Sequence, residues 1–255
     1  MTFHRYVALG DSFTEGVGDP DETRPNGVRG WADRIAEVMA GDDFAYANLA
    51  IRGRKLLEIV GTQIEPALDL KPDLVSIYAG ANDVLRPRID IDRLVQAYDV
   101  GIGRLVAGGA HVVMFSAYDP GWSPVFGALR GRFAIYNELV REVAEKHDAT
   151  LVDFWRLGDY RDDRLWDIDK MHMSSAGHQR MAIAVLDELG IEHDLRPLPL
   201  ADRPVLSAKE RRAANIEWAR AHAAPWVKRR LTGTSSGDDL EPKWPVLAPV
   251  VSRNA

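Results

Sequence analysis

The sequence predicts an α/β fold in which a five-stranded parallel sheet is covered by helices on both faces. Five short runs rich in Val, Ile, Leu, Tyr and Phe alternate with longer segments of helical periodicity up to residue 190. Strands that alternate with helices pair in parallel and bury both faces of their sheet. The chain has 255 residues, 46% of them hydrophobic, which is enough to bury such a core.

These runs and segments predict the order of the elements. The expected strands cover residues 5–9, 44–48, 74–79, 111–116 and 150–154. The expected helices cover residues 31–40, 55–69, 91–106, 129–147 and 174–189. We expect Asp90 and Ser174 to cap the starts of two helices, and Gly190 to end the last one.

The chain changes in character after Leu200. Residues 201–255 carry 10 Lys and Arg against 6 Asp and Glu, whereas residues 1–200 carry 22 against 32. We therefore expect a catalytic domain over residues 1–200 and a C-terminal extension over residues 201–255. Within the extension, the pattern predicts a capped helix over 207–222 and irregular, Pro-containing chain over 232–255.

Three of the seven tryptophans lie in this extension, at Trp218, Trp226 and Trp244. They predict that it docks on an apolar surface, either on its own domain or as the arm of a homo-oligomer. The cationic cluster at 228–230 would suit an acidic partner surface.

Composition excludes several classes of protein. The net charge of -6 argues against a nucleic-acid partner, which requires a concentrated excess of Lys and Arg. We expect no membrane span, because no run approaches the roughly 18 apolar residues that crossing a bilayer takes. The N-terminal segment lacks the pattern of a cleavable signal, so we expect a cytoplasmic protein. The absence of cysteine excludes disulfides, thiolate catalysis and Cys-type zinc sites.

Four polar or glycine positions follow the predicted strands. Ser12 comes after the first strand, Gly53 after the second, Asn82 after the third, and His172 after the fifth and a loop. Ligands of parallel α/β sheets collect at the carboxyl ends of the strands, near the point where strand order reverses. We therefore expect these positions to meet in one crevice.

The residue types at these positions suit acyl transfer by a serine, which needs a nucleophile, a base, a group that orients the base, and oxyanion donors. Only one of the seven histidines, His172, has an aspartate three residues before it, and this spacing lets Asp169 reach Nδ1 while Nε2 faces outward. Structural roles stay open at this point. Ser12 could be a helix N-cap, Asn82 could cap a turn, and Gly53 could simply supply a positive φ.

The ordered set Gly10-Asp11-Ser12 with Gly16, Gly53, Gly80-x-Asn82-Asp83 and Asp169-x-x-His172 resembles the SGNH, or GDSL, hydrolases over about residues 4 to 190. The resemblance implies a flavodoxin-like three-layer α/β/α sandwich and a serine esterase or lipase that works through an acyl-enzyme. It implies Ser12 as nucleophile, His172 as base and Asp169 as its orienting acid. It also implies an oxyanion hole made by the Ser12 and Gly53 N–H groups and the Asn82 amide.

The substrate implied is a small acyl ester, and neither a metal nor an organic cofactor is required. After the fourth strand, Tyr118, Trp122, Pro124 and Phe126 form a loop that could line the acyl pocket or pack on its own core. Three cations around Gly53, at positions 52, 54 and 55, could favour an anionic substrate or be solvated.

Two other functions remain open. An acyltransferase could use the same three catalytic residues. A binding protein could keep the fold without turnover.

Overall fold

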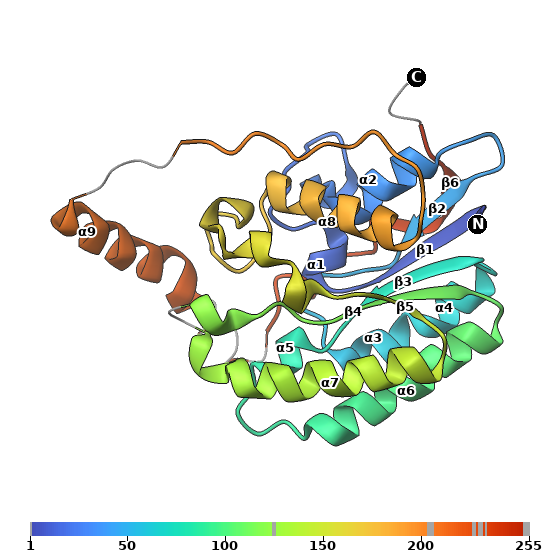
Figure 1. The fold of residues 1–255 in the computed structure, drawn as a ribbon, viewed down its shortest axis with the longest axis horizontal. Coiled ribbons are helices and arrows are strands. Elements are labelled where there is room, and N and C mark those ends of the chain that lie inside the picture. The colour runs from blue at the N-terminus through green and yellow to red at the C-terminus, as the bar shows by residue number, and fades with distance from the viewer. Residues whose placement is uncertain are drawn as a thin grey trace.

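A six-stranded sheet forms the centre of the fold (Figure 1). The computed structural model describes residues 2–123, 126–202, 207–225, 228, 232 and 234–251. Five strands are parallel and confirm the predicted ones: β1 Arg5–Gly10, β2 Ala45–Asn48, β3 Leu74–Tyr78, β4 His111–Phe115 and β5 Thr150–Val152. The order across the sheet is β5-β4-β3-β1-β2-β6. The chain leaves β1 for β2 on one side and then crosses to β3 on the other, so strand order reverses beside β1.

The sixth strand corrects the expectation of five strands and of an irregular C-terminal tail. β6, Trp244–Pro249, lies antiparallel to β2 at the edge of the sheet. The sequence did not predict this strand because two of its six residues are proline. Proline has no N–H to donate to a neighbouring strand and is tolerated only in edge strands. The C-terminal extension is therefore part of the sheet.

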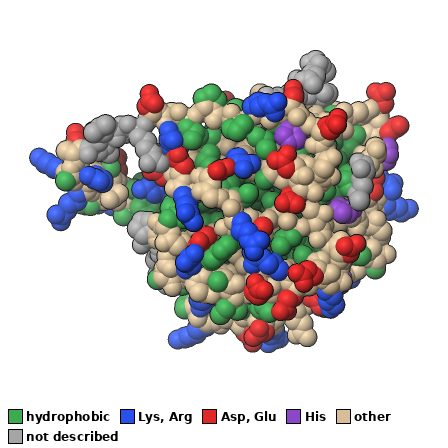
Figure 2. Space-filling view, in the orientation of Figure 1, with side chains coloured by type: hydrophobic (Ala, Val, Ile, Leu, Met, Phe, Trp, Pro, Cys, Tyr) green, Lys and Arg blue, Asp and Glu red, His purple; other side chains and the backbone are tan. Residues whose placement is uncertain are grey.

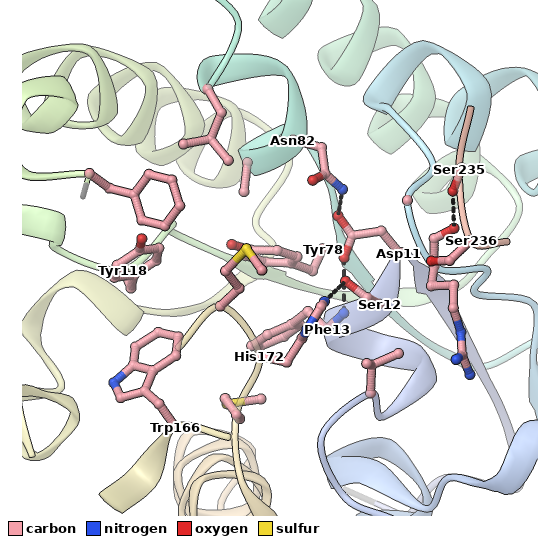
Figure 3. Close-up of a pocket in the computed structure, with 18 of the residues that line it drawn as sticks. Asp11, Ser12, Phe13, Tyr78, Asn82, Tyr118, Trp166, His172, Ser235 and Ser236 are labelled. Carbon is pink, nitrogen blue, oxygen red and sulfur yellow. Dashed lines mark hydrogen bonds between the residues drawn. The ribbon is translucent and has the colours of Figure 1, made fainter. Parts of the chain in front are cut away.

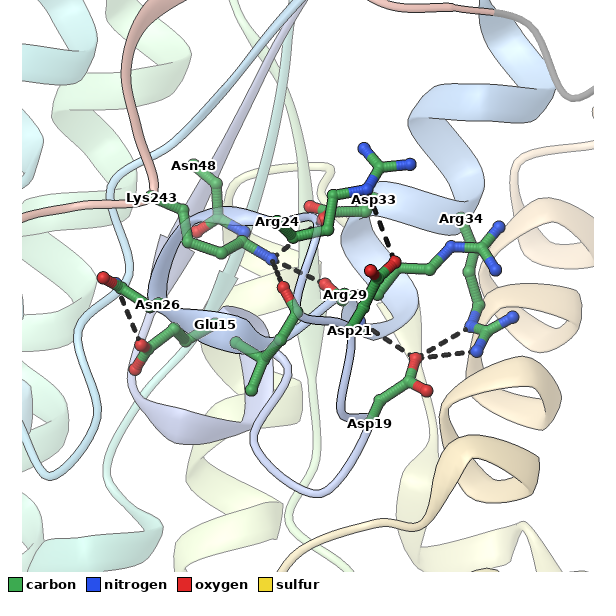
Figure 4. A network of polar contacts seen from close by, with 12 residues as sticks. Glu15, Asp19, Asp21, Arg24, Asn26, Arg29, Asp33, Arg34, Asn48 and Lys243 are labelled. Atoms are coloured by element: carbon green, nitrogen blue, oxygen red, sulfur yellow. Dashed lines mark hydrogen bonds and ion pairs between the residues drawn. The ribbon is translucent and has the colours of Figure 1, made fainter.

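Lys243 anchors this extension in the body of the protein (Figure 4). Its ammonium group donates to the Asp33 carboxylate at 2.9 Å and to the backbone oxygens of Val28 and Arg29, and both charged side chains are almost fully buried. Removing one partner of a buried ion pair leaves an uncompensated charge and typically costs about 3–5 kcal/mol. The pair therefore opposes detachment of the extension.

Apart from α9 (Ala208–Trp218), the longer helices form two layers, one on each face of the sheet (Figure 1). The longer helices are α2 Gly30–Met39, α3 Leu56–Thr62, α4 Ile64–Asp69, α6 Ile91–Ala107, α7 Arg130–Lys146, α8 Ser175–Glu188 and α9 Ala208–Trp218. Two single-turn helices, α1 Ser12–Glu15 and α5 Ala81–Val84, follow β1 and β3. Short 3-10 helices occupy the loops at Pro25–Gly27, Pro120–Trp122, Gly127–Leu129, Phe154–Arg156, Gly158–Arg161 and Asp163–Leu165.

Most helix signals in the sequence are confirmed. Asp90 and Ser174 cap α6 and α8 through their side chains, and Gly190 has the positive φ of a helix stop. The single helix expected over 55–69 is wrong, because the chain breaks at Gln63. The Gln63 side chain turns inward to bond both backbone groups of Gly10, and Pro66 lacks the N–H that would continue the helix.

The two faces of the sheet bury separate apolar clusters. Along β1, Val7 and Leu9 pack into one cluster with α3, α4, α6 and α7, whereas Tyr6 and Ala8 pack into the other with α2 and α8. This alternation follows from the two-residue period of a strand. The arrangement confirms the predicted three-layer α/β/α fold and leaves the carboxyl ends of the strands for the site.

Acidic and basic side chains are interspersed over the face of the molecule that Figure 2 shows. α9 projects beyond the body with several basic side chains (Figures 1 and 2). In the part of the chain that the structure describes, no helix is both long enough and apolar enough to pass through a bilayer.

Candidate active site

Ser12 stands at the turn from β1 into α1, where the chain leaves the sheet. The N-cap of α1 is Asp11, whose carboxylate accepts the Phe13 N–H at 3.0 Å, so the N-cap role left open for Ser12 is wrong. Ser12 is the first residue of the helix, and its hydroxyl is free to face the cavity. Position 10 requires glycine, because a Cβ there would lie 2.6 Å from the carbonyl oxygen of Tyr78 on the neighbouring strand β3.

His172 contacts the Ser12 hydroxyl on one side (Figure 3) and the Asp169 carboxylate on the other. Its Nε2 lies 3.0 Å from the Ser12 hydroxyl, and its Nδ1 lies 2.5 Å from Asp169 Oδ2. The other Asp169 oxygen accepts the N–H groups of Met171 and His172 at 2.8 and 3.0 Å. These two bonds fix the orientation of the carboxylate. Lys170 adopts a positive φ of 56° inside this turn, an uncommon conformation for a residue with a side chain.

The same contacts set the charge of Asp169. Burial favours the neutral acid, but the hydrogen bond and attraction of His172 and two backbone N–H groups outweigh it and lower the pKa of Asp169 to about 2. Asp169 is therefore an anion at neutral pH. A carboxylate at Nδ1 leaves Nε2 as the nitrogen that can take a proton from the Ser12 hydroxyl.

A tight turn over residues 51–54 lies against the same cavity. Gly53 has a φ of +81°, so the positive-φ role left open for it is confirmed, and it lines the same cavity as Ser12. Among the residues that the structure describes, neither the Ser12 N–H nor the Gly53 N–H donates a hydrogen bond. Both are therefore available to an anion.

Two of the three cations around Gly53 pair with carboxylates. The Arg52 guanidinium pairs with the fully buried Glu15 carboxylate at 2.7 Å, and the Arg52 N–H donates to the same carboxylate at 2.7 Å. Lys55 lies 3.5 Å from Glu58. Arg52 thus pairs with Glu15 and also lines the cavity, so its preference for an anionic substrate stays a prediction.

Asn82 approaches from the end of β3. The N-cap of α5 is Gly80, so Asn82 does not cap its own turn. Its amide nitrogen instead donates to Asp11 Oδ2 at 2.9 Å and to the Arg54 carbonyl oxygen at 3.2 Å. Both amide hydrogens therefore have protein acceptors in the free site.

Asp11 is a site residue that the sequence analysis assigned no role. Its burial raises its pKa to about 7, against the opposing effects of the Phe13 N–H and of His172, while the carboxylates of Asp83 and Glu15 add to the rise. A carboxyl group that titrates near neutrality thus holds the Asn82 amide. Its position inside the Gly10-Asp11-Ser12 motif was the available signal.

A cavity of about 230 Å³ is lined by Asp11, Ser12, Gly53, Asn82 and His172. Its apolar wall consists mainly of aromatic and methionine side chains, and these are Phe13, Tyr78, Tyr118, Phe126, Phe133, Phe154, Trp166, Met171 and Met173. Of the pocket residues expected from sequence, Tyr118 and Phe126 lie in this wall. Trp122 does not line this cavity, because its ring packs on Trp166 at 5.7 Å from outside and is 37% exposed.

The opposite wall includes Thr234, Ser235 and Ser236 from the C-terminal extension (Figure 3). Short polar residues in a segment of irregular composition gave no signal for this role. Two tryptophans of the extension contact the catalytic part of the chain. Lys170 lies over the Trp218 ring at 5.1 Å, and Trp244 packs against the apolar cluster of α2 and α8. Pro124, Trp226 and two residues of the cationic cluster, Arg229 and Arg230, lie outside the described residues.

One family of known proteins matches most of this chain. The model of the GDSL-like Lipase/Acylhydrolase family matches residues 8–180. A comparison with curated proteins gives no match.

Several solved structures are similar in fold. The acetylxylan esterase Axe2 from Geobacillus stearothermophilus is 20% identical, with a TM-score of 0.60 over 75% of this chain and 98% of that one. An α/β hydrolase from the metagenome of Lake Arreo is 24% identical, with a TM-score of 0.60 over 73% and 95%. The psychrotrophic esterase EstA from Pseudoalteromonas sp. is 18% identical, with a TM-score of 0.57 over 73% and 97%.

Proposed function

We propose, from the premise that this chain belongs to the GDSL-like lipase/acylhydrolase family, that it hydrolyses carboxylic esters through a covalent acyl-enzyme on Ser12. The observation that carries the proposal is the unbroken line of contacts from the Ser12 hydroxyl through His172 to Asp169. A nucleophile, a base and an orienting carboxylate in hydrogen-bond contact are the requirements of this chemistry.

In the first step, the Ser12 Oγ attacks the acyl carbonyl carbon while His172 Nε2 takes the hydroxyl proton. The imidazolium that forms lies against Asp169, whose negative charge stabilises it. The tetrahedral intermediate then breaks its bond to the alcohol, and His172 returns the proton to that leaving oxygen. Water attacks the acyl-enzyme by the same route, which releases the acid and restores Ser12.

The oxyanion of each intermediate would accept hydrogen bonds from the Ser12 and Gly53 N–H groups. These two donors are supported by their freedom from other bonds among the described residues. Asn82 would add its amide by giving up or sharing one of its present acceptors, Asp11 or the Arg54 oxygen. Donors that are oriented in advance are worth about 3–4 kcal/mol each.

The aromatic and methionine wall supports an apolar group on one side of the scissile ester. Tyr118, Phe126 and Trp166 present ring surface to the cavity, and such surface binds acyl chains without directional bonds. The acyl group would lie here.

Hydrolysis of p-nitrophenyl esters from two to sixteen carbons tests the proposal directly. We expect wild-type turnover with a preferred chain length, and a loss of roughly 10⁴-fold or more in kcat for Ser12→Ala, because Ser12 supplies the one hydroxyl among the described residues that contacts His172 Nε2. The readout is nitrophenolate release. A matched control is Ser207→Ala, which removes a hydroxyl that caps the distant helix α9.

Labelling with an alkyl fluorophosphonate separates an inactive site from a wrong substrate. A competent site would be modified at Ser12 even if every ester in the series were poor. Absence of both turnover and labelling in the wild type would reject the proposal. Equal turnover by Ser12→Ala would move the chemistry to another residue.

A further inference from the structure

We propose that Ser235, in the C-terminal extension, is a positioning residue for the oxyanion hole. Its hydroxyl holds the peptide bond between Arg52 and Gly53 in the orientation that leaves the Gly53 N–H free for the oxyanion. This inference rests on the proposed ester hydrolysis. It assigns a role in the reaction to a segment beyond the region that the family matches, residues 8–180.

The turn that carries Gly53 belongs to a class that closes in two forms, type I and type II. It spans residues 51–54 and is closed by the Arg54 N–H bonding to the Ile51 oxygen at 3.4 Å. The φ of +81° at its third residue, Gly53, is that of a type II turn. Types I and II differ mainly by a flip of the central peptide, which here is the Arg52–Gly53 peptide. The direction of the Gly53 N–H therefore depends on which form is populated.

Ser235 contacts the other end of that same peptide. Its hydroxyl donates to the Arg52 carbonyl oxygen at 3.1 Å. In a trans peptide the carbonyl oxygen and the N–H point in opposite directions, so this bond directs the Gly53 N–H away from Ser235. A hydrogen bond accepted by the carbonyl also polarises the N–H across the peptide and makes it a better donor.

The backbone around this contact leaves little freedom. The Ser235 hydroxyl also accepts the Gly237 N–H at 3.1 Å, and the Ser235 N–H donates to Asp238 at 2.8 Å. A Cβ on Gly237 would lie 2.2 Å from the Arg52 oxygen, and one on Gly53 would lie 1.9 Å from the Ser235 hydroxyl oxygen. Both glycines are therefore needed for the extension to approach the turn this closely.

The preceding peptide of the turn is held separately. The Arg52 N–H donates to the buried Glu15 carboxylate. Glu15 thus restrains the entry to the turn, and Ser235 restrains its centre. Lys243 and β6 keep the extension in place without Ser235, so a change at Ser235 should leave the fold intact.

Ser235→Ala tests the inference in the full-length protein. We expect kcat to fall about tenfold, as for the loss of one net hydrogen bond, with KM and melting temperature close to the wild-type values. Affinity for an alkylboronic acid, whose tetrahedral serine adduct places an oxygen in the oxyanion hole, should fall by a similar factor. Ser207→Ala, in the same extension, serves as the control for general loosening.

The outcomes separate the two proposals. A wild-type enzyme that is active, together with Ser235→Ala that keeps wild-type kcat and boronate affinity, would overturn the role of Ser235 alone. A rise in KM with unchanged kcat would also overturn it, because that is the sign of ordinary substrate contact. A wild-type enzyme that neither turns over esters nor reacts with fluorophosphonate would remove the proposed function itself.

Discussion

Two histidine–aspartate pairs of almost the same geometry occur in this protein. His172 Nδ1 lies 2.5 Å from Asp169, and His147 Nε2 lies 2.6 Å from Asp99. Their burial is also similar, with side-chain exposures of 28% and 16% in the first pair and 16% and 24% in the second. Neither distance nor burial therefore distinguishes the proposed catalytic pair from the second pair.

The difference lies in the other contacts of each pair. The free oxygen of Asp169 is held by two backbone N–H groups, and the far nitrogen of His172 meets the Ser12 hydroxyl. The second oxygen of Asp99 instead receives the flexible Lys146 ammonium group at 2.7 Å. His147 ends α7 just before β5, at the amino edge of the sheet, away from the crevice. His172 meets the Ser12 hydroxyl because both lie at the carboxyl edge of the sheet, where several loops converge.

Replacing each aspartate in turn gives the largest contrast. We expect Asp169→Asn to lower kcat by roughly 10⁴-fold, because an amide in place of the carboxylate stabilises the wrong tautomer of His172. Asp99→Asn should leave kcat unchanged. Steady-state kinetics on the preferred p-nitrophenyl ester decides between these, and equal effects of the two variants would contradict the distinction drawn here.

Asn82→Ala tests the proposed oxyanion donor, a group that the pair of His147 and Asp99 lacks. We expect kcat to fall by about 10²–10³-fold, while the fold survives. Asn215→Ala, on the exposed face of α9, is the control and should match the wild type. Unchanged turnover in Asn82→Ala would remove Asn82 from the site.

The smallest effect should be on the free energy of unfolding at acid pH. The pKa of Asp169 in the folded state, about 2, lies below the ordinary 3.8. Its contacts therefore stabilise the fold fully above that ordinary value, and this contribution is lost as pH falls toward 2. The shift corresponds to about 2 kcal/mol, so unfolding free energy should fall less between pH 5 and 2 in Asp169→Asn than in the wild type.

Asp99 also has a lowered pKa, chiefly through the hydrogen bond from Lys146. Asp99→Asn should therefore also reduce the fall in unfolding free energy at acid pH, even though it leaves activity unchanged. Urea unfolding at each pH measures both variants. An identical fall in unfolding free energy at acid pH in the wild type and Asp169→Asn would show that the contacts of Asp169 do not favour its charged form.

The sequence predicted the five parallel strands and the meeting of Ser12, Gly53, Asn82 and His172 because these follow from local patterns. Apolar runs mark buried strands, and the carboxyl ends of parallel strands share one edge. The break at Gln63 depends instead on a side chain reaching Gly10, a contact between residues far apart in sequence. No periodicity in one segment reports such a contact.

The C-terminal extension was hardest to predict for the same reason. β6 has no alternating pattern, and its place is decided by β2 and by the buried pair of Lys243 and Asp33. The side chains that line the cavity from 234–236 are small and polar, as in many loops. The role of Trp122 was misplaced because adjacency to a pocket loop does not say which rings face inward.

The position of β6 also bears on how the protein meets other copies of itself. An outermost strand offers unpaired backbone groups to which another chain can add. Pro245 and Pro249 both lie in β6, and neither has an N–H to donate. β6 is therefore a poor template for the addition of another strand, and it covers the edge that β2 would otherwise present.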